Sequence, residues 1–237
     1  MTIPNADAAR ERLHALASPE QAATAQRYFK TGPGEYGAGD RFIGVRVPQI
    51  RALVRELAAM PLADIKRLLT SAIHEERVLA LLLMVRQYER GGDQLRQRLF
   101  ELYLANTRHI NNWDLVDCSA EYVVGAHIAD GDRSLLERLT RSESLWERRI
   151  AVLASRTFIK RGEYGDTLRI AEMLIDDEED LIHKAVGWML REIGDRDRER
   201  EQRFLRVHYR RMPRTMLRYA IEKFPEEERL RWLRGEA

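Results

Sequence analysis

The chain repeats a short pattern at intervals of 34 to 36 residues, and this spacing restricts the fold more than any other feature. Five apolar, helix-like segments come into register when each is aligned on its first basic or aromatic residue. These residues are Arg77, Trp113, Arg149, Lys184 and Arg218, and the intervals between them are 36, 36, 35 and 34 positions. One amphipathic segment separates each from the next, so each repeat holds two helices, which is typical of an α-solenoid.

Helical periodicity extends over almost the whole chain. Apolar residues recur three and four positions apart in segments such as 76–90, 145–162 and 180–194, and no segment alternates like a strand. We therefore predict an all-α protein, an α-solenoid of HEAT-like helical repeats that forms a single domain over residues 1–237. A non-repetitive helical bundle is the alternative. The glycine-rich segment 31–40 is predicted to be a flexible loop.

Composition excludes several classes of protein. The 237 residues are 44% apolar and 33% charged, which is typical of a globular domain, and no apolar run reaches the ~18 residues of a transmembrane helix. Cys118 is the only cysteine and the six histidines are scattered, so we expect no disulfide, no metal centre and no cofactor. The N-terminus lacks an apolar signal segment, and we expect a cytoplasmic monomer.

The charges are unevenly distributed. Thirty-five of the forty basic residues are arginines, whose planar side chains suit phosphate binding. Residues 41–55 and 203–221 hold arginines and no acid, whereas residues 172–180 hold six acids and no base. This separation predicts one positive and one negative face, with the cations of the repeat register lining a curved, concave basic groove that binds nucleic acid. Solvated faces and an arginine-rich codon usage are the alternatives.

Two motifs place a carboxylate near aromatic and basic residues. In NNWDLVD, Trp113 and Asp117 are four residues apart and share one helix face, whereas Asp114 lies about 100° round the helix. Asp117 lies among apolar residues, so it either accepts structural hydrogen bonds or serves as a carboxylate held beside an aromatic ring in a groove. In LWERRIAVL, the repeat register places Arg149 against Asp117, where an ion pair would keep the carboxylate charged. An ordinary salt bridge between repeats is the alternative.

A third motif, HKAVGWMLRE, places a tryptophan between cations. Lys184, Trp188 and Arg191 share a helix face. A tryptophan flanked by two cations is unusual in a dry core and natural beside a sugar–phosphate chain. Gly187 costs about 1 kcal/mol relative to alanine in a helix, which predicts the close approach of another helix or of a ligand.

These motifs, in this order and at these separations, resemble the AlkD-like DNA alkylation repair proteins, which are alkylpurine DNA glycosylases built from HEAT-like repeats. The segments ATAQRYFK and RFIGVRVPQIRAL are similar to the opening helices of that family, so the resemblance covers nearly the whole chain. It implies that Trp113 and Trp188 pack against the deoxyribose of the damaged nucleotide, that Asp117 is the catalytic carboxylate, and that Arg149 contacts the nearby backbone. Tyr28 matches a tyrosine that lines the same site.

The resemblance implies a monofunctional glycosylase of base excision repair that hydrolyses the N-glycosidic bond of cationic N3- or N7-alkylated purines, such as 3-methyladenine and 7-methylguanine, in duplex DNA. A cationic base leaves without a general acid, so one carboxylate that stabilises the oxocarbenium-like sugar is enough. The family's mode of recognition uses no pocket for a flipped base. Two features depart from the family pattern: Asn112 stands where some members carry a second tryptophan, and loop 31–40 is longer than expected.

We expect duplex DNA as the partner, which would also place the protein at the nucleoid. The residues that we predict to contact it are Tyr28, Arg46, Lys184, Arg191, Arg210, Arg211, Arg214 and Arg218. The alternative to an enzyme is a non-catalytic HEAT-like scaffold that binds nucleic acid or protein.

Overall fold

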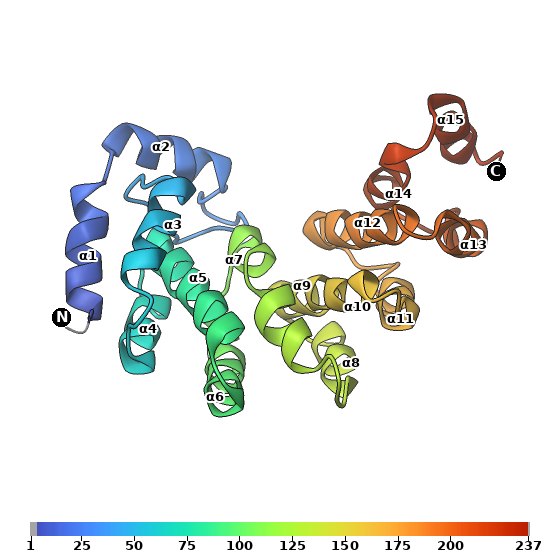
Figure 1. The fold of residues 1–237 in the computed structure, drawn as a ribbon. Helices are drawn as coiled ribbons and strands as arrows, with labels where there is room; N and C mark the ends of the chain where they lie inside the picture. Colours follow the sequence, from blue (N-terminus) through green and yellow to red (C-terminus); the bar gives the residue numbers. More distant parts are fainter. Residues whose placement is uncertain (1–3, 237) are drawn as a thin grey trace. The chain divides into compact units, whose positions relative to one another are not determined.

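The structure, a computed structural model, describes residues 4–236, and this part of the chain is helical apart from loops and one isolated β-bridge between Arg41 and Ile73. The predicted all-α class is confirmed (Figure 1). The chain divides into two compact units, residues 1–123 (unit 1) and 124–237 (unit 2). The division falls within a π-helical turn, Glu121–Gly125.

Unit 1 is organised around one long helix. Its helices are α1 (Ala6–Ala15), α2 (Pro19–Tyr28), α3 (Val47–Glu56), α4 (Leu62–Leu69), α5 (His74–Arg90), α6 (Asp93–Leu104) and α7 (Trp113–Asp117), with a 3₁₀ turn at Thr107–His109. Helix α5 packs against α1, α3, α4, α6 and α7, which explains why most of its apolar residues are fully buried. Ser18 caps α2, because its Oγ accepts a hydrogen bond from the Gln21 amide at 3.3 Å.

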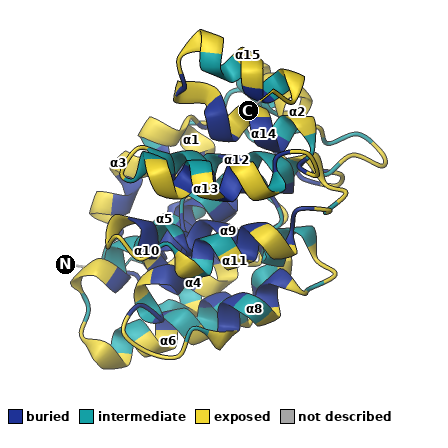
Figure 2. Cartoon of the chain, turned by 90° about the vertical axis from the view of Figure 1, so that its right-hand side faces the viewer, coloured by how far each residue is buried: buried dark blue, intermediate teal, exposed yellow. Residues whose placement is uncertain are grey.

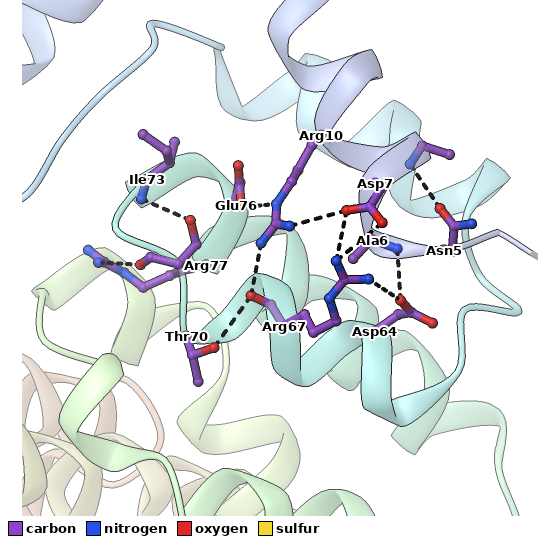
Figure 3. Close-up of polar contacts among 12 residues, drawn as sticks. Asn5, Ala6, Asp7, Arg10, Asp64, Arg67, Thr70, Ile73, Glu76 and Arg77 are labelled. Carbon is purple, nitrogen blue, oxygen red and sulfur yellow. Dashed lines mark hydrogen bonds and ion pairs between the residues drawn. The ribbon is translucent and has the colours of Figure 1, made fainter.

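Ion pairs hold α1 against α4 and α5 (Figure 3). Arg67 donates to Asp7 at 2.8 Å, and Arg10 donates to Glu76 at 2.9 Å. The amide of Ala6, at the start of α1, donates to the Asp64 carboxylate at 3.1 Å. Apart from Glu76, which is buried, these groups are exposed or half-buried, so the Ala9 and Leu13 face of α1 provides most of the stabilisation.

The first turn of α5 is charged and yet buried. His74, Glu75, Glu76 and Arg77 are each at most 5% exposed. The Glu75 carboxylate accepts hydrogen bonds from the amides of residues 43–45, the shortest of them 2.7 Å from Gly44. A buried carboxylate is tolerated only when such donors replace water. The charged turn therefore ties the segment that follows the glycine-rich loop to the centre of unit 1.

Unit 2 is organised around α12. Its helices are α8 (Ser134–Thr140), α9 (Leu145–Ala154), α10 (Arg156–Lys160), α11 (Gly165–Met173), α12 (Asp180–Gly194), α13 (Arg198–His208), α14 (Arg214–Ala220) and α15 (Glu226–Arg234), with a 3₁₀ turn at Ile221–Lys223. Helix α12 packs against α9, α11, α13 and α14. The helical segment predicted over 145–162 is interrupted at the buried Ser155, whose hydroxyl donates to the Val152 carbonyl at 2.7 Å.

The helix order confirms the predicted repeat. Helices α5, α7, α9, α12 and α14 carry the five residues of the repeat register, and one or two other helices separate each of these helices from the next. Most helices have one buried and one exposed side, as the alternating colours of Figure 2 show. The α-solenoid class is therefore confirmed, whereas the curved basic groove and the single domain stay predictions. No helix within residues 4–236 combines the length and the apolarity needed to cross a membrane.

Candidate active site

Helix α7 carries Trp113, Asp114 and Asp117, and its N-terminus is anchored by the two asparagines that precede it. Asn112 is fully buried, and its Oδ1 caps the helix by accepting from the Trp113 amide at 2.9 Å. The Asn112 Nδ2 group donates to the buried Asp40 at 3.3 Å. Asn112 thus has a structural role in this chain.

Asp40 and His74 form the core of a buried charge network. The two ring nitrogens of His74 lie 3.0 Å from Asp40 Oδ2 and 2.8 Å from Asp114 Oδ2, and Arg77 donates to Asp40 Oδ1 at 2.6 Å. Carboxylates only accept, so the imidazolium form alone donates to both. We name Asp40, His74, Arg77 and Asp114 the histidine cluster.

The electrostatics of the histidine cluster favour the charged forms. Burial opposes ionisation of Asp40, but the hydrogen bonds and charges of His74 and Arg77 outweigh it and hold the Asp40 pKa at about 2. Burial also disfavours charge on His74, but its hydrogen bonds to Asp114 and Asp40 outweigh burial and raise its pKa. The cluster therefore holds α7 against α5 and the end of the glycine-rich loop.

The buried position of Arg77 differs from the one predicted. The repeat register placed Arg77 among the cations of the groove, but the structure buries Arg77 and pairs it with Asp40. Asp114 was placed only by its angle round the helix, and the structure shows that it binds His74. Asp40 and His74 were not singled out. The signal that could have found His74 is HEER, four polar residues that stand directly before the apolar run VLALLLMV in one helix.

An aromatic cluster supports Trp113. The Trp113 ring stacks on Phe29 with centroids 5.3 Å apart, and Tyr28 meets it edge-on at 6.0 Å. Phe29 in turn stacks on Phe42 at 5.0 Å, and Phe42 stacks on His74 at 4.4 Å. Trp113 is half-buried and Tyr28 is 64% exposed, so the indole is held in a fixed orientation at the surface of unit 1.

A cavity of about 280 Å³ adjoins this cluster. Tyr28, Phe29, Phe42, Arg46 and Asp114 are among its lining residues. The structure therefore brings together Tyr28 and Arg46, two residues predicted to contact DNA, on the side of unit 1 that carries α7. Arg46 is exposed. It directly precedes helix α3 and belongs to the acid-free stretch 41–55.

Asp117 lies at the C-terminal end of α7, one turn after Trp113, and is half-buried. Helical spacing places Asp117 on the face of α7 that carries Trp113, whereas Asp114 binds His74. The two carboxylates of NNWDLVD therefore differ in environment, as the sequence predicted from their angular separation. The predicted pair of Asp117 and Arg149 joins residues of different units and stays a prediction.

The predicted site residues Arg149 and Trp188 make hydrogen bonds and ring contacts within unit 2. Arg149 is 5% exposed and donates to the Leu181 carbonyl at 2.6 Å. The Trp188 indole N–H donates to Glu192 at 3.1 Å, and the Arg156 guanidinium lies 5.6 Å from the Trp188 ring centroid. Burial opposes ionisation of Glu192, but the charge of Arg156 and these hydrogen bonds outweigh it and lower its pKa.

The two cations beside Trp188 have acidic partners. Lys184 lies 2.8 Å from Asp180, and Arg191 forms an ion pair with Glu222. The close approach predicted at Gly187 is that of a helix, because a Cβ there would lie 2.4 Å from the Met216 carbonyl oxygen of α14.

The arginine-rich segment 203–221 is exposed at its predicted DNA contacts. These are Arg210, Arg211, Arg214 and Arg218. Arg211 pairs with Asp176 at 2.5 Å, and Arg148 pairs with Asp177 at 2.7 Å. Neighbouring arginines therefore partly neutralise the acidic run 172–180. The separation into one positive and one negative face stays a prediction.

Comparison with known proteins identifies the family. The family model described as "DNA alkylation repair enzyme" matches residues 9–224. The chain belongs to this family. DNA alkylation repair enzymes act on DNA, so the chain has a role in alkylation repair. A solved structure described as a predicted DNA alkylation repair enzyme from Enterococcus faecalis has a TM-score of 0.69 and 18% identity, and the match covers 95% of this chain and 100% of that one. This likeness confirms the fold, and no curated protein sequence matches the chain.

Proposed function

We propose that this DNA alkylation repair enzyme is a monofunctional glycosylase that hydrolyses the N-glycosidic bond of cationic N3- and N7-alkylated purines in duplex DNA. The observation that carries the proposal is the division of tasks within α7. The histidine cluster engages Asp114 and so fixes the helix, while Asp117 lies one turn after a surface tryptophan held by stacked rings. We assign catalysis to Asp117.

The proposed reaction needs one carboxylate. Alkylation gives the purine a positive charge, so the C1′–N bond breaks with both electrons moving to the base, which leaves neutral. The sugar becomes an oxocarbenium-like cation, and the Asp117 carboxylate stabilises it and accepts the proton of the attacking water. The indole faces of Trp113 and Trp188 add cation–π attraction of about 0.5–2 kcal/mol each.

The remaining predicted residues position the DNA. We assign Arg149 to the backbone beside the damaged nucleotide. Tyr28 and Arg46 are the contacts that we propose for unit 1, and their place on the rim of the 280 Å³ cavity supports a common role. For unit 2 we propose Lys184, Arg191, Arg210, Arg211, Arg214 and Arg218. Such phosphate contacts fix the position of the protein without reading sequence, so selectivity comes from the weakened glycosidic bond of the lesion.

The test is release of 7-methylguanine from a duplex that contains it, measured as free base and as strand breaks after alkaline treatment. We expect Asp117→Asn to lower the single-turnover rate at least about a hundredfold, because it removes the charge that stabilises the sugar cation, while DNA binding persists. Asp93→Asn, at an exposed aspartate of α6, is the matched control and should keep the wild-type rate.

Equal rates for Asp117→Asn and the wild-type protein would contradict the proposed mechanism. A wild-type protein that gives no strand breaks but shifts DNA in a salt-dependent manner would instead support the scaffold alternative.

A further inference from the structure

A second cavity in unit 1 lies at the other end of α5. Its volume is about 510 Å³, against 280 Å³ for the cavity beside the aromatic cluster. It is lined by the segment between α3 and α4, by the C-terminal turns of α5, and by the first turns of α6. Arg86, in its wall, follows His74 by twelve residues of one helix, which is about 18 Å along the axis. This cavity is therefore separate from the candidate active site.

Three arginines and no acid line the cavity. Arg86 and Arg90 are on successive turns of α5, and Arg98 is on α6. Within residues 4–236, none of the three has a carboxylate partner, and the buried Arg86 Nε has no hydrogen-bond acceptor. Elsewhere in unit 1 arginines such as Arg10 and Arg67 are paired with acids. Like charges on successive turns repel each other, so the arrangement favours an anionic ligand.

The floor of the cavity is aliphatic. Met60 is 1% exposed, and the lining also includes Pro61, Leu62 and Leu95 but no aromatic side chain. Gln87 fixes the shape of this floor, because its amide donates to the carbonyls of Ala58 and Met60 at 3.0 and 2.7 Å. Bases of single-stranded nucleic acid bind by stacking on aromatic rings, and this cavity offers none.

We propose that the cavity binds an acidic peptide segment of a partner protein that carries an aliphatic side chain. The side chain enters between Met60 and Leu95, and the carboxylates form charge-assisted hydrogen bonds with Arg86, Arg90 and Arg98. Three guanidinium groups on two helices match several negative charges on one chain. The volume is within the range of about 300–1,000 Å³ that is usual for ligand sites. The inference does not depend on the proposed glycosylase activity.

The test uses the full-length protein and a fluorescein-labelled peptide of four aspartates followed by two leucines, with binding read as fluorescence anisotropy at low salt. We expect Arg86→Gln and Arg98→Gln each to weaken binding about tenfold. A peptide with serines in place of the leucines should bind at least about tenfold more weakly than the leucine peptide, because it leaves the aliphatic floor uncovered. Arg55→Gln, at an exposed arginine of α3 outside the cavity, is the matched control and should bind like wild type.

Arg98 is exposed, so its replacement keeps the test valid if Arg86→Gln does not fold. The proposal is overturned if the serine and leucine peptides bind equally, or if Arg55→Gln weakens binding as much as Arg98→Gln. Tighter binding of a single-stranded oligonucleotide that is weakened by the same two cavity variants would assign the cavity to nucleic acid and overturn the proposal as well.

Discussion

His74 carries a positive charge in the interior of unit 1 because both of its ring nitrogens meet carboxylates. It is 2% exposed, between Asp40 and Asp114, and the Phe42 ring covers one of its faces. Breaking such a buried pair leaves an uncompensated charge, which costs more than the pair itself contributes. At the residue scale, the position of Trp113 and α7 therefore depends on a buried ion-pair network.

Replacement of this histidine tests the histidine cluster. We expect His74→Gln to lower the free energy of unfolding by about 3–5 kcal/mol, because glutamine removes the charged partner of Asp114 and one of the two charged partners of Asp40. Because the His74 pKa is raised, its contribution is complete below about pH 6.5, the ordinary value, and is lost as the pH rises through the folded-state pKa. Urea unfolding at several pH values measures both effects.

The matched control for this prediction is His14→Gln, at an exposed histidine of α1, which should unfold like wild type. An equal loss of stability in the two variants would contradict a special role of His74.

Glu201 of α13 is another buried carboxyl group, and its surroundings favour the protonated form. It is 1% exposed, its Oε1 has no hydrogen-bond partner, and burial raises its pKa to about 8. Its carboxyl group lies where a Cβ on Gly194 would be, which explains the glycine at the end of α12. Between the ordinary pKa of 4.5 and about 8, the unfolded chain ionises this group and the folded chain does not.

Stability should therefore fall as the pH rises from 5 to 8, and Glu201→Gln should reduce this fall. We expect a stability difference between variant and wild type that grows in favour of the variant by on the order of 2 kcal/mol over this range. The measurement is urea unfolding of both proteins at each pH. Parallel pH profiles would show that Glu201 ionises normally in the folded protein.

At the element scale, helix packing explains why a glycine stands in the interior of α12. Alanine is preferred over glycine within helices by about 1 kcal/mol. At residue 187, however, a Cβ would lie 2.4 Å from the Met216 carbonyl oxygen and 2.5 Å from the Tyr219 Cβ. Neither backbone nor Cβ can move away cheaply, so the close contact of α12 with α14 outweighs helix propensity.

The corresponding variant is Gly187→Ala. We expect it to lower the free energy of unfolding by about 1–3 kcal/mol, because α12 and α14 must separate to admit the methyl group. Gly165→Ala is the matched control, because nothing lies within 4 Å of the added Cβ at the start of α11. Thermal unfolding should therefore show a lower midpoint for Gly187→Ala alone. A midpoint at or above that of wild type would mean that the helices yield easily.

At the scale of the whole molecule, the proposed function involves charge and predicted site residues from both units. Trp113 and Asp117 belong to unit 1, and Arg149 and Trp188 belong to unit 2. The net charge is only +2, so affinity for DNA must come from local clusters of arginine. The exposed arginines of segment 203–221 are the strongest candidates for phosphate contacts, although Arg211 forms an ion pair with Asp176.

Salt dependence tests these arginines. We expect the double variant Arg214→Gln, Arg218→Gln to bind duplex DNA more weakly and to reduce the slope of log K against log salt by about 2, because each lost phosphate contact removes about 0.9. Anisotropy titrations over a range of salt concentrations give the slope. Arg141→Gln, at an exposed arginine of unit 2 that pairs with Glu137, is the control. An unchanged slope in the double variant would remove these arginines from the interface.

Much of the site was predictable and part of it was not. The grouping of Trp113 with Tyr28 was implied by the family resemblance, and their ring contact agrees with it. The different environments of Asp114 and Asp117 follow from helix geometry alone. The partners of Asp114 could not be predicted, because His74 lies forty residues away and its burial depends on how α5 packs.

The amino-acid sequence by itself determined the helices, their alternation in repeats of 34 to 36 residues, and the family, because periodicity, caps and motifs are properties of neighbouring residues. Only the tertiary structure decided that Arg77 is buried and paired with Asp40 rather than part of a groove. It also decided that α14 packs closely against α12 at Gly187, and that Asp114 binds a charged histidine. The physical reason is that burial and pairing are set by segments far apart in the chain, and desolvation then decides which charged groups need a partner.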